Sequence, residues 1–159
     1  MSDRKCRNDK IDNPNEDRFV KALLDRHWVD DVQIGNDWQS GNITALTNYG
    51  ETFIIEYTRR KVDDITQFDR YGGMSLGQNK VDRILTRNAD GHYWVVEDNN
   101  GTYWWADLQA WDSTGTITRR KPRANGAKSF RDTEPCYNWK GKDMKNWFNE
   151  DTAFQGGAW

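Results

Sequence analysis

The residues best suited to chemistry are three carboxylates in the first part of the chain, Glu16, Asp37 and Glu56. Glu56 lies within an apolar, β-branched and aromatic run at 52–58, where a strand has no structural need for a charge. Glu56 and Asp37 are nineteen residues apart with a turn between them, so they can converge at one sheet edge. Carboxylates grouped in this way are the ligands that Mg²⁺ prefers. With a nearby side-chain cation, such a site can hydrolyse a phosphodiester.

Each of these carboxylates also has a structural interpretation, which the sequence leaves open. Glu56 can form a buried ion pair with Arg60 or Lys61. Asp37 follows Gly35-Asn36, a setting typical of a turn residue. Glu16 stands near the start of an expected helix, where the helix dipole favours an acidic side chain.

A positive charge for such a site must come from the same strand or from the next helix. Strand alternation places Ile54, Glu56, Thr58 and Arg60 on one face, and Phe53, Ile55, Tyr57 and Arg59 on the other. Arg60 therefore shares the face of Glu56. Lys80 is the nearest candidate from the following helix, so we expect Arg60 or Lys80 to supply the cation.

The first half of the chain predicts a helix followed by a meander of strands. A polar arm at 1–13 precedes a helix at 14–28, with Asn13 as its N-cap. A strand fragment at 32–34 runs into the loop that holds Asp37. Strands at 43–47 and 52–58 follow.

The second half predicts a helix, a hairpin and a long tail. Residues 61–74 are expected to form a loop, and Ser75 to cap a helix whose apolar stripe includes Val81 and Ile84. Asn99-Asn100-Gly101 joins two aromatic strands at 92–98 and 102–107. A short helical turn at 108–112, a basic loop from residue 113 and a helix near 142–148 complete the chain. The sequence thus predicts a single α+β domain at 14–159, with a central mixed sheet flanked by helices.

Charge is unevenly distributed, although the net charge is only −2. Between residues 117 and 145, Lys and Arg exceed Asp and Glu by six. Such a surplus indicates an anionic partner. Candidates for following a phosphate backbone are Arg119, Arg120, Lys121, Arg123, Lys128 and Arg131, with Trp139 or Phe130 stacking on bases. The same cations suit an acidic protein partner, or simply a solvated loop.

Composition excludes several other classes. Nine tryptophans predict an aromatic-rich core, some of whose rings can serve recognition. Cys6 and Cys136 form no CxxC pair, so neither a structural zinc site nor a disulfide is expected. The chain has no dinucleotide-binding, P-loop or hydrolase-elbow motif. With no transmembrane run or leader, we expect a cytoplasmic protein with reduced thiols.

The order of these motifs resembles the PD-(D/E)xK nuclease superfamily, in particular its phage-encoded and Holliday-junction-resolvase-like members. The resemblance rests on a helix with Glu16, then Asp37, then the strand Phe53-Ile54-Ile55-Glu56-Tyr57-Thr58, then a helix with Gln78 and Lys80, and then the aromatic hairpin. It covers roughly residues 14–140 and implies a restriction-endonuclease-like core. It also implies Mg²⁺-dependent, or Mn²⁺-dependent, hydrolysis of DNA.

Two departures from the family pattern open an alternative. Thr58 stands where the family has a lysine, and no Pro-Asp pair precedes the strand. Asp37 is our choice for the second metal ligand, and Asn42 lies nearer to where several relatives would place it. The alternative is an inactive nuclease-fold module that binds a host protein, a virion component or nucleic acid. A homodimer is compatible with either reading.

Overall fold

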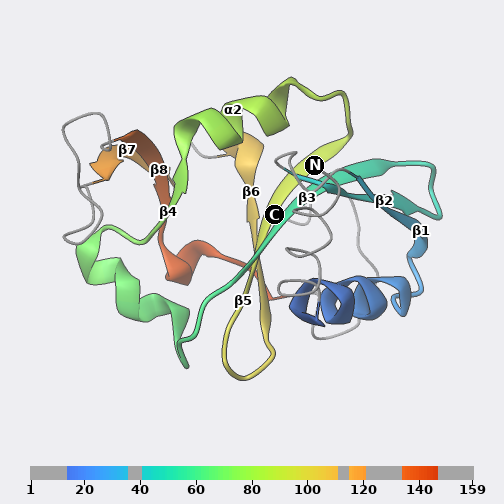
Figure 1. Ribbon diagram of the computed structural model, residues 1–159, viewed down its shortest axis with the longest axis horizontal. Helices are drawn as coiled ribbons and strands as arrows, with labels where there is room; N and C mark the ends of the chain where they lie inside the picture. Colours follow the sequence, from blue (N-terminus) through green and yellow to red (C-terminus); the bar gives the residue numbers. More distant parts are fainter. Residues whose placement is uncertain (1–13, 36–40, 111–114, 121–133, 147–159) are drawn as a thin grey trace, which may run out of the picture.

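The computed structural model describes residues 14–35, 41–110, 115–120 and 134–146. A five-stranded sheet in the order β1-β2-β3-β5-β6 organises this part of the chain (Figure 1). Its strands are β1 (Val29–Ile34), β2 (Ile43–Thr47), β3 (Thr52–Arg59), β5 (Gly91–Glu97) and β6 (Tyr103–Asp107). β3 and β5 run parallel, and the other neighbours run antiparallel. The predicted α+β class with a mixed central sheet is therefore confirmed.

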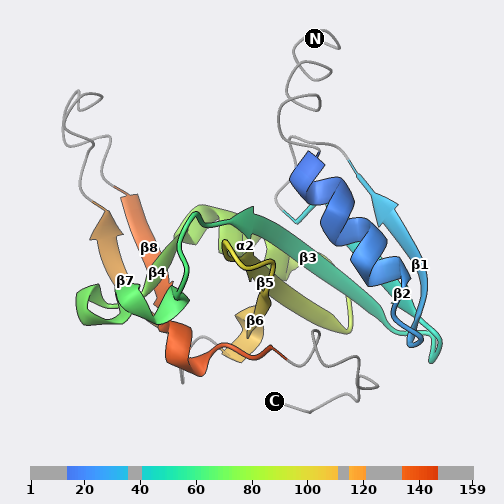
Figure 2. The ribbon, with the colours of Figure 1, turned by 90° about the horizontal axis from the view of Figure 1, so that it is seen from below.

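A second sheet lies at one end of the molecule along its longest axis (Figure 1). Its three antiparallel strands are ordered β4-β8-β7, with β4 at Met74–Gly77, β8 at Glu134–Trp139 and β7 at Gly115–Arg120. The N-terminal helix, residues 14–24, lies at the opposite end, beside β1 and β2 (Figures 1 and 2). Helix α2 (Gln78–Thr86) and the 3-10 segments η1 (Ile65–Tyr71), η2 (Leu108–Ala110) and η4 (Gly141–Asp143) complete the fold.

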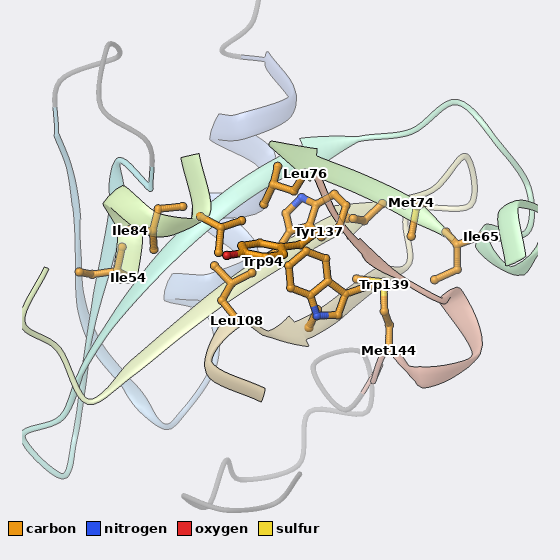
Figure 3. Close-up of a cluster of buried hydrophobic side chains, with 13 residues drawn as sticks. Ile54, Ile65, Met74, Leu76, Ile84, Trp94, Leu108, Tyr137, Trp139 and Met144 are labelled. Atoms are coloured by element: carbon orange, nitrogen blue, oxygen red, sulfur yellow. The ribbon is translucent and has the colours of Figure 1, made fainter. Parts of the chain in front are cut away.

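The central sheet buries a different aromatic cluster on each face. On one face the N-terminal helix inserts Phe19 and Leu23 against Phe53, Tyr93 and Trp105. On the other face, α2 and the second sheet bury a cluster with Trp94 and Trp139 at its centre (Figure 3). Strand alternation explains the division, since successive side chains of β3 and β5 point to opposite faces.

Tryptophan in the described residues belongs to the core rather than to a recognition surface. Trp28, Trp94, Trp105 and Trp139 are buried, and Trp104 is partly buried on the face opposite to that of Trp105. Trp104 and Trp105 are neighbours in β6, so strand alternation sends them to opposite faces. The prediction that Trp139 stacks on bases is wrong, because its ring is buried and packs edge-on against Trp94.

Several predicted boundaries are also wrong. The first helix ends at residue 24 rather than 28, because the chain turns there and begins β1 at Val29. Ser75 caps no helix. It lies in β4, where its hydroxyl donates to Asn138 Oδ1 at 2.8 Å, and α2 begins three residues later.

The predicted loop at 61–74 contains η1, and the predicted basic tail contains β7 and β8. A helix was predicted near 142–148. In the described part of that range, up to residue 146, η4 ends at Asp143 and Lys145 forms an isolated bridge with Trp105. The hairpin agrees with the prediction, and so does the described part, 108–110, of the turn predicted at 108–112. The predicted arm at 1–13 lies outside the described residues.

Two smaller findings concern the membrane and the thiols. None of the helices described is both long enough and apolar enough to cross a membrane. Cys136 is a buried cysteine in β8, and Cys6 lies outside the described residues.

Candidate functional site

Glu56 lies in β3 at a partly covered position and accepts hydrogen bonds on both carboxylate oxygens. The backbone N–H of Gly41 donates to Oε1 at 2.6 Å, and Lys80 Nζ lies 3.2 Å from Oε2. The Glu56 side chain is 13 % exposed, whereas that of Lys80 is 43 % exposed. The carboxylate is thus fixed inside while the ammonium keeps access to solvent.

Local sequence explains why this carboxylate and this cation meet. Glu56 points to the face covered by α2, because Ile54 on the same face packs in the cluster with Val81 and Ile84 of that helix. With those two side chains turned inward, Lys80 is left at the helix margin, with its long stem free to reach Glu56. The ion pair expected for Glu56 with Arg60 or Lys61 is therefore observed with Lys80.

Thr58 has a role that the sequence analysis missed. Its hydroxyl accepts a hydrogen bond from Trp94 Nε1 at 3.1 Å. Trp94 is the registered neighbour of Glu56 on β5, and it is fully buried. Thr58 thus satisfies the one polar atom of a core tryptophan. A lysine at this position would lack the acceptor that the indole uses.

The remaining predicted site residues are dispersed. The helix that carries Glu16 packs on the sheet face opposite to the Glu56 side chain, so the structure does not bring these two carboxylates to one face. Arg60 follows β3 directly, and its backbone N–H donates to Glu97 O at 2.9 Å. Asp37 lies outside the described residues, although Gly41, which contacts Glu56, follows that segment. Asn42 precedes β2, where its carbonyl accepts from Gly35 N.

The predicted nucleic-acid-binding cations lie at or beyond the end of β7. Arg119 and Arg120 are its last two residues, paired in register with Pro135 and Glu134 of β8. The other four, Lys121, Arg123, Lys128 and Arg131, lie outside the described residues, as does Phe130. Part of the basic stretch is therefore strand rather than loop.

A second polar cluster, not predicted from the sequence, lies on the opposite face of the sheet. The side chain of Glu97 is 2 % exposed, and its carboxylate accepts from Arg18 at 2.8 and 3.0 Å and from the hydroxyl of Tyr57. Asn15 Oδ1 accepts from both Arg18 and Arg59. The hydrogen bond to Glu97 raises the pKa of the Arg18 guanidinium. Burial is the larger cause, and the hydrogen bond to Glu97 the smaller one, that raises the pKa of the Tyr57 hydroxyl. This cluster fastens the N-terminal helix to the sheet.

One sequence signal points to this cluster in retrospect. Glu97 continues the alternation of Tyr93 and Val95 on β5, so it must enter the same core as they do. A carboxylate there requires donors. Because Arg18 lies 79 residues away, the sequence does not identify it as the partner.

A divalent cation needs more oxygen ligands than Glu56 provides. No group of three or more His, Cys, Asp or Glu side chains suited to a metal occurs within the described ranges. Both Glu56 oxygens already accept hydrogen bonds from nitrogen donors. The described residues alone therefore do not fit Mg²⁺, and a site on Glu56 requires a further ligand such as Asp37 and the displacement of a donor.

Comparison with known proteins adds no relative. No protein-family model matches the chain, and no match was found among curated proteins or solved structures. The arrangement at Glu56 is a carboxylate fixed beside a solvent-accessible ammonium. Chemically, such a pair can place a positive charge next to an anionic ligand, and the carboxylate can act once a donor leaves it.

Proposed function

We propose that the chain is a phage-type, nuclease-like protein that hydrolyses phosphodiester bonds in DNA with Mg²⁺ or Mn²⁺ and acts in the host cytoplasm. One observation carries the proposal: Lys80 Nζ lies 3.2 Å from Glu56 in the middle of a central strand. Lys80 thereby supplies, from the next helix, the positive charge that Thr58 cannot provide. The N-terminal helix, the strands β1 to β3, the helix α2 and the parallel strand β5 follow one another in the order on which the resemblance to PD-(D/E)xK nucleases rests, with η1 and β4 inserted before α2.

In this proposal the residues divide the work between them. Glu56 and Asp37 are the carboxylates that would hold the cation, which would neutralise charge on the phosphate. Lys80 would face the phosphate, and its side chain, which is 43 % exposed, is accessible to one. Arg119 and Arg120 would contact the DNA backbone together with the cations that follow β7. Glu16 and Arg60 retain auxiliary roles at most.

A second candidate is a non-catalytic module that binds a host protein, a virion component or nucleic acid. The observation in its favour is that both oxygens of Glu56 are already occupied by Gly41 and Lys80. A carboxylate held in this way serves as a structural ion pair and needs no metal. The basic stretch around β7 would then be the binding surface, and a homodimer remains compatible with it.

A cleavage assay separates the two candidates. Supercoiled, branched and single-stranded DNA are incubated with the protein and Mg²⁺ or Mn²⁺, and EDTA serves as the metal-free control. We expect cleavage by the wild type, and a loss of about 100-fold or more in Glu56→Gln and in Lys80→Met. The first change would weaken the hold on the cation, and the second would remove a positive charge from beside the reacting phosphate.

Matched variants guard against unspecific effects. Glu51→Gln alters a carboxylate just before the same strand, and Lys61→Met alters an exposed lysine soon after it. Both should cleave within about twofold of the wild type, since neither touches Glu56. Absence of cleavage on every substrate, combined with DNA binding that survives Glu56→Gln, would overturn the nuclease proposal and support the binding module.

A further inference from the structure

Gly41 is held at both ends of its backbone. Its N–H donates to Glu56 Oε1 at 2.6 Å, and its carbonyl accepts from Arg87 Nη1 at 2.5 Å. The first contact fixes one of the two oxygens of Glu56, and Lys80 fixes the other. The orientation of the carboxylate therefore depends on where Gly41 is placed.

Glycine is the residue that fits this position without strain. Gly41 has φ +65°, a left-handed conformation that other residues adopt at a cost. A Cβ at this position would lie 2.8 Å from Ile54 Cγ2 and 3.1 Å from Ile84 Cγ1. The backbone is thus pressed into the space between β3 and α2, close enough for its N–H to reach Glu56.

Arg87 is in turn fixed between α2 and β5. It is the C-cap of α2, and its N–H donates to Ile84 O. Its carbonyl lies 2.7 Å from His92 Nε2. Because a carbonyl only accepts, His92 carries its proton on Nε2. With its backbone held on both sides, Arg87 has a defined position from which its guanidinium reaches Gly41.

We propose that Arg87 is a positioning residue for Glu56 and acts through the backbone of Gly41. Two residues of the α2 segment then orient one carboxylate, Lys80 directly and Arg87 through a peptide. Without the guanidinium, Gly41 is free to turn its N–H away, and Oε1 loses its donor. This inference rests on the proposed function in one respect, which is that Glu56 is the working carboxylate.

Amide hydrogen exchange tests this positioning of Gly41 by Arg87 without an assay of DNA cleavage. In Arg87→Met, we expect the Gly41 amide to exchange at least tenfold faster than in the wild type, while the amide of Val95 in the central sheet is unchanged. The matched control is Arg83→Met, which alters an exposed arginine of the same helix. Arg87→Lys keeps the charge and should restore part of the protection. Gly41 exchange within twofold of wild type in Arg87→Met, or in Arg87→Ala should Arg87→Met not fold, would overturn the proposal.

Activity supplies a second readout that separates this inference from the proposed function. If the wild type cleaves DNA, Arg87→Met should lower kcat at least tenfold with little change in KM for DNA, because Arg87 contacts the carboxylate's support rather than the substrate. A normal kcat in Arg87→Met would overturn the positioning role while leaving the nuclease intact. If the wild type cleaves nothing, the proposed function fails, and Gly41 exchange still decides whether Arg87 positions Gly41.

Discussion

Glu97 shows what an individual charge requires inside this protein. Its buried carboxylate has Arg18 and Tyr57 as donors. In Arg18→Met, we expect the free energy of unfolding to fall by about 2 kcal/mol, since a buried charge loses its partner. The figure lies below that for a fully buried pair because the Arg18 side chain is 47 % exposed. Chemical denaturation measures the loss, with Lys21→Met, an exposed lysine of the same helix, as the control.

A double-mutant cycle distinguishes this pairing from general damage to the helix. Glu97→Met combined with Arg18→Met should be less destabilised than the two single changes added together, because neither charge is then left alone. Tyr57→Phe removes only one neutral donor and should cost about 1 kcal/mol. Additive costs for Arg18 and Glu97 would show that the ion pair is not what fastens the helix.

For individual residues, the sequence predicted the sheet face of a side chain better than it predicted the residue to which that side chain bonds. Alternation correctly placed Glu56 and Thr58 together, since it depends only on neighbouring residues. It did not identify Trp94 as the donor to Thr58, and it left Lys80 as one of three candidate cations for Glu56, beside Arg60 and Lys61. Those contacts depend on the parallel register of β3 with β5 and on the docking of α2, which no local pattern encodes.

Among the elements, the strands of the second sheet were hidden from sequence analysis for a similar reason. Met74–Gly77 is too short to show alternation, and its partner β8 lies about sixty residues further along the chain. The 99–101 hairpin was predictable because Asn-Gly joins adjacent strands, and Gly101 adopts φ +77° as such a turn requires. Local turn chemistry is legible in the sequence, whereas distant pairing is not.

Gly73 controls the start of β4. It has φ +101°, and a Cβ there would lie 2.3 Å from the carbonyl oxygen of Trp139. Gly50 has a similar φ of +82° with nothing within 4 Å of the added atom. We expect Gly50→Ala to cost about 1 kcal/mol, for the backbone conformation alone. Gly73→Ala should cost roughly 2 kcal/mol more, because β4 must move away from β8. Equal urea midpoints for the two variants would contradict the close contact.

Over the whole molecule, the two sheets share one core. Trp94 of the central sheet and Trp139 of the second sheet pack edge-on, with their ring centroids 5.6 Å apart. Ile84 of α2 and Leu76 of β4 belong to the same buried cluster (Figure 3). Because this cluster contains residues of both sheets, unfolding of one sheet would also expose the buried residues of the other. The predicted single domain therefore implies that both sheets unfold in one cooperative step.

Trp139→Leu tests that cooperativity. It should lower the free energy of unfolding by about 3 kcal/mol, because a buried ring is replaced by a smaller side chain. Hydrogen exchange should report the same loss at Tyr137 in β8 and at Val95 in β5, since both depend on the shared cluster. As a control, Tyr71→Ala alters a tyrosine that is 73 % exposed and should change stability by less than about 0.5 kcal/mol. If Tyr137 alone lost protection while Val95 kept its wild-type value, the second sheet would be a separate folding unit.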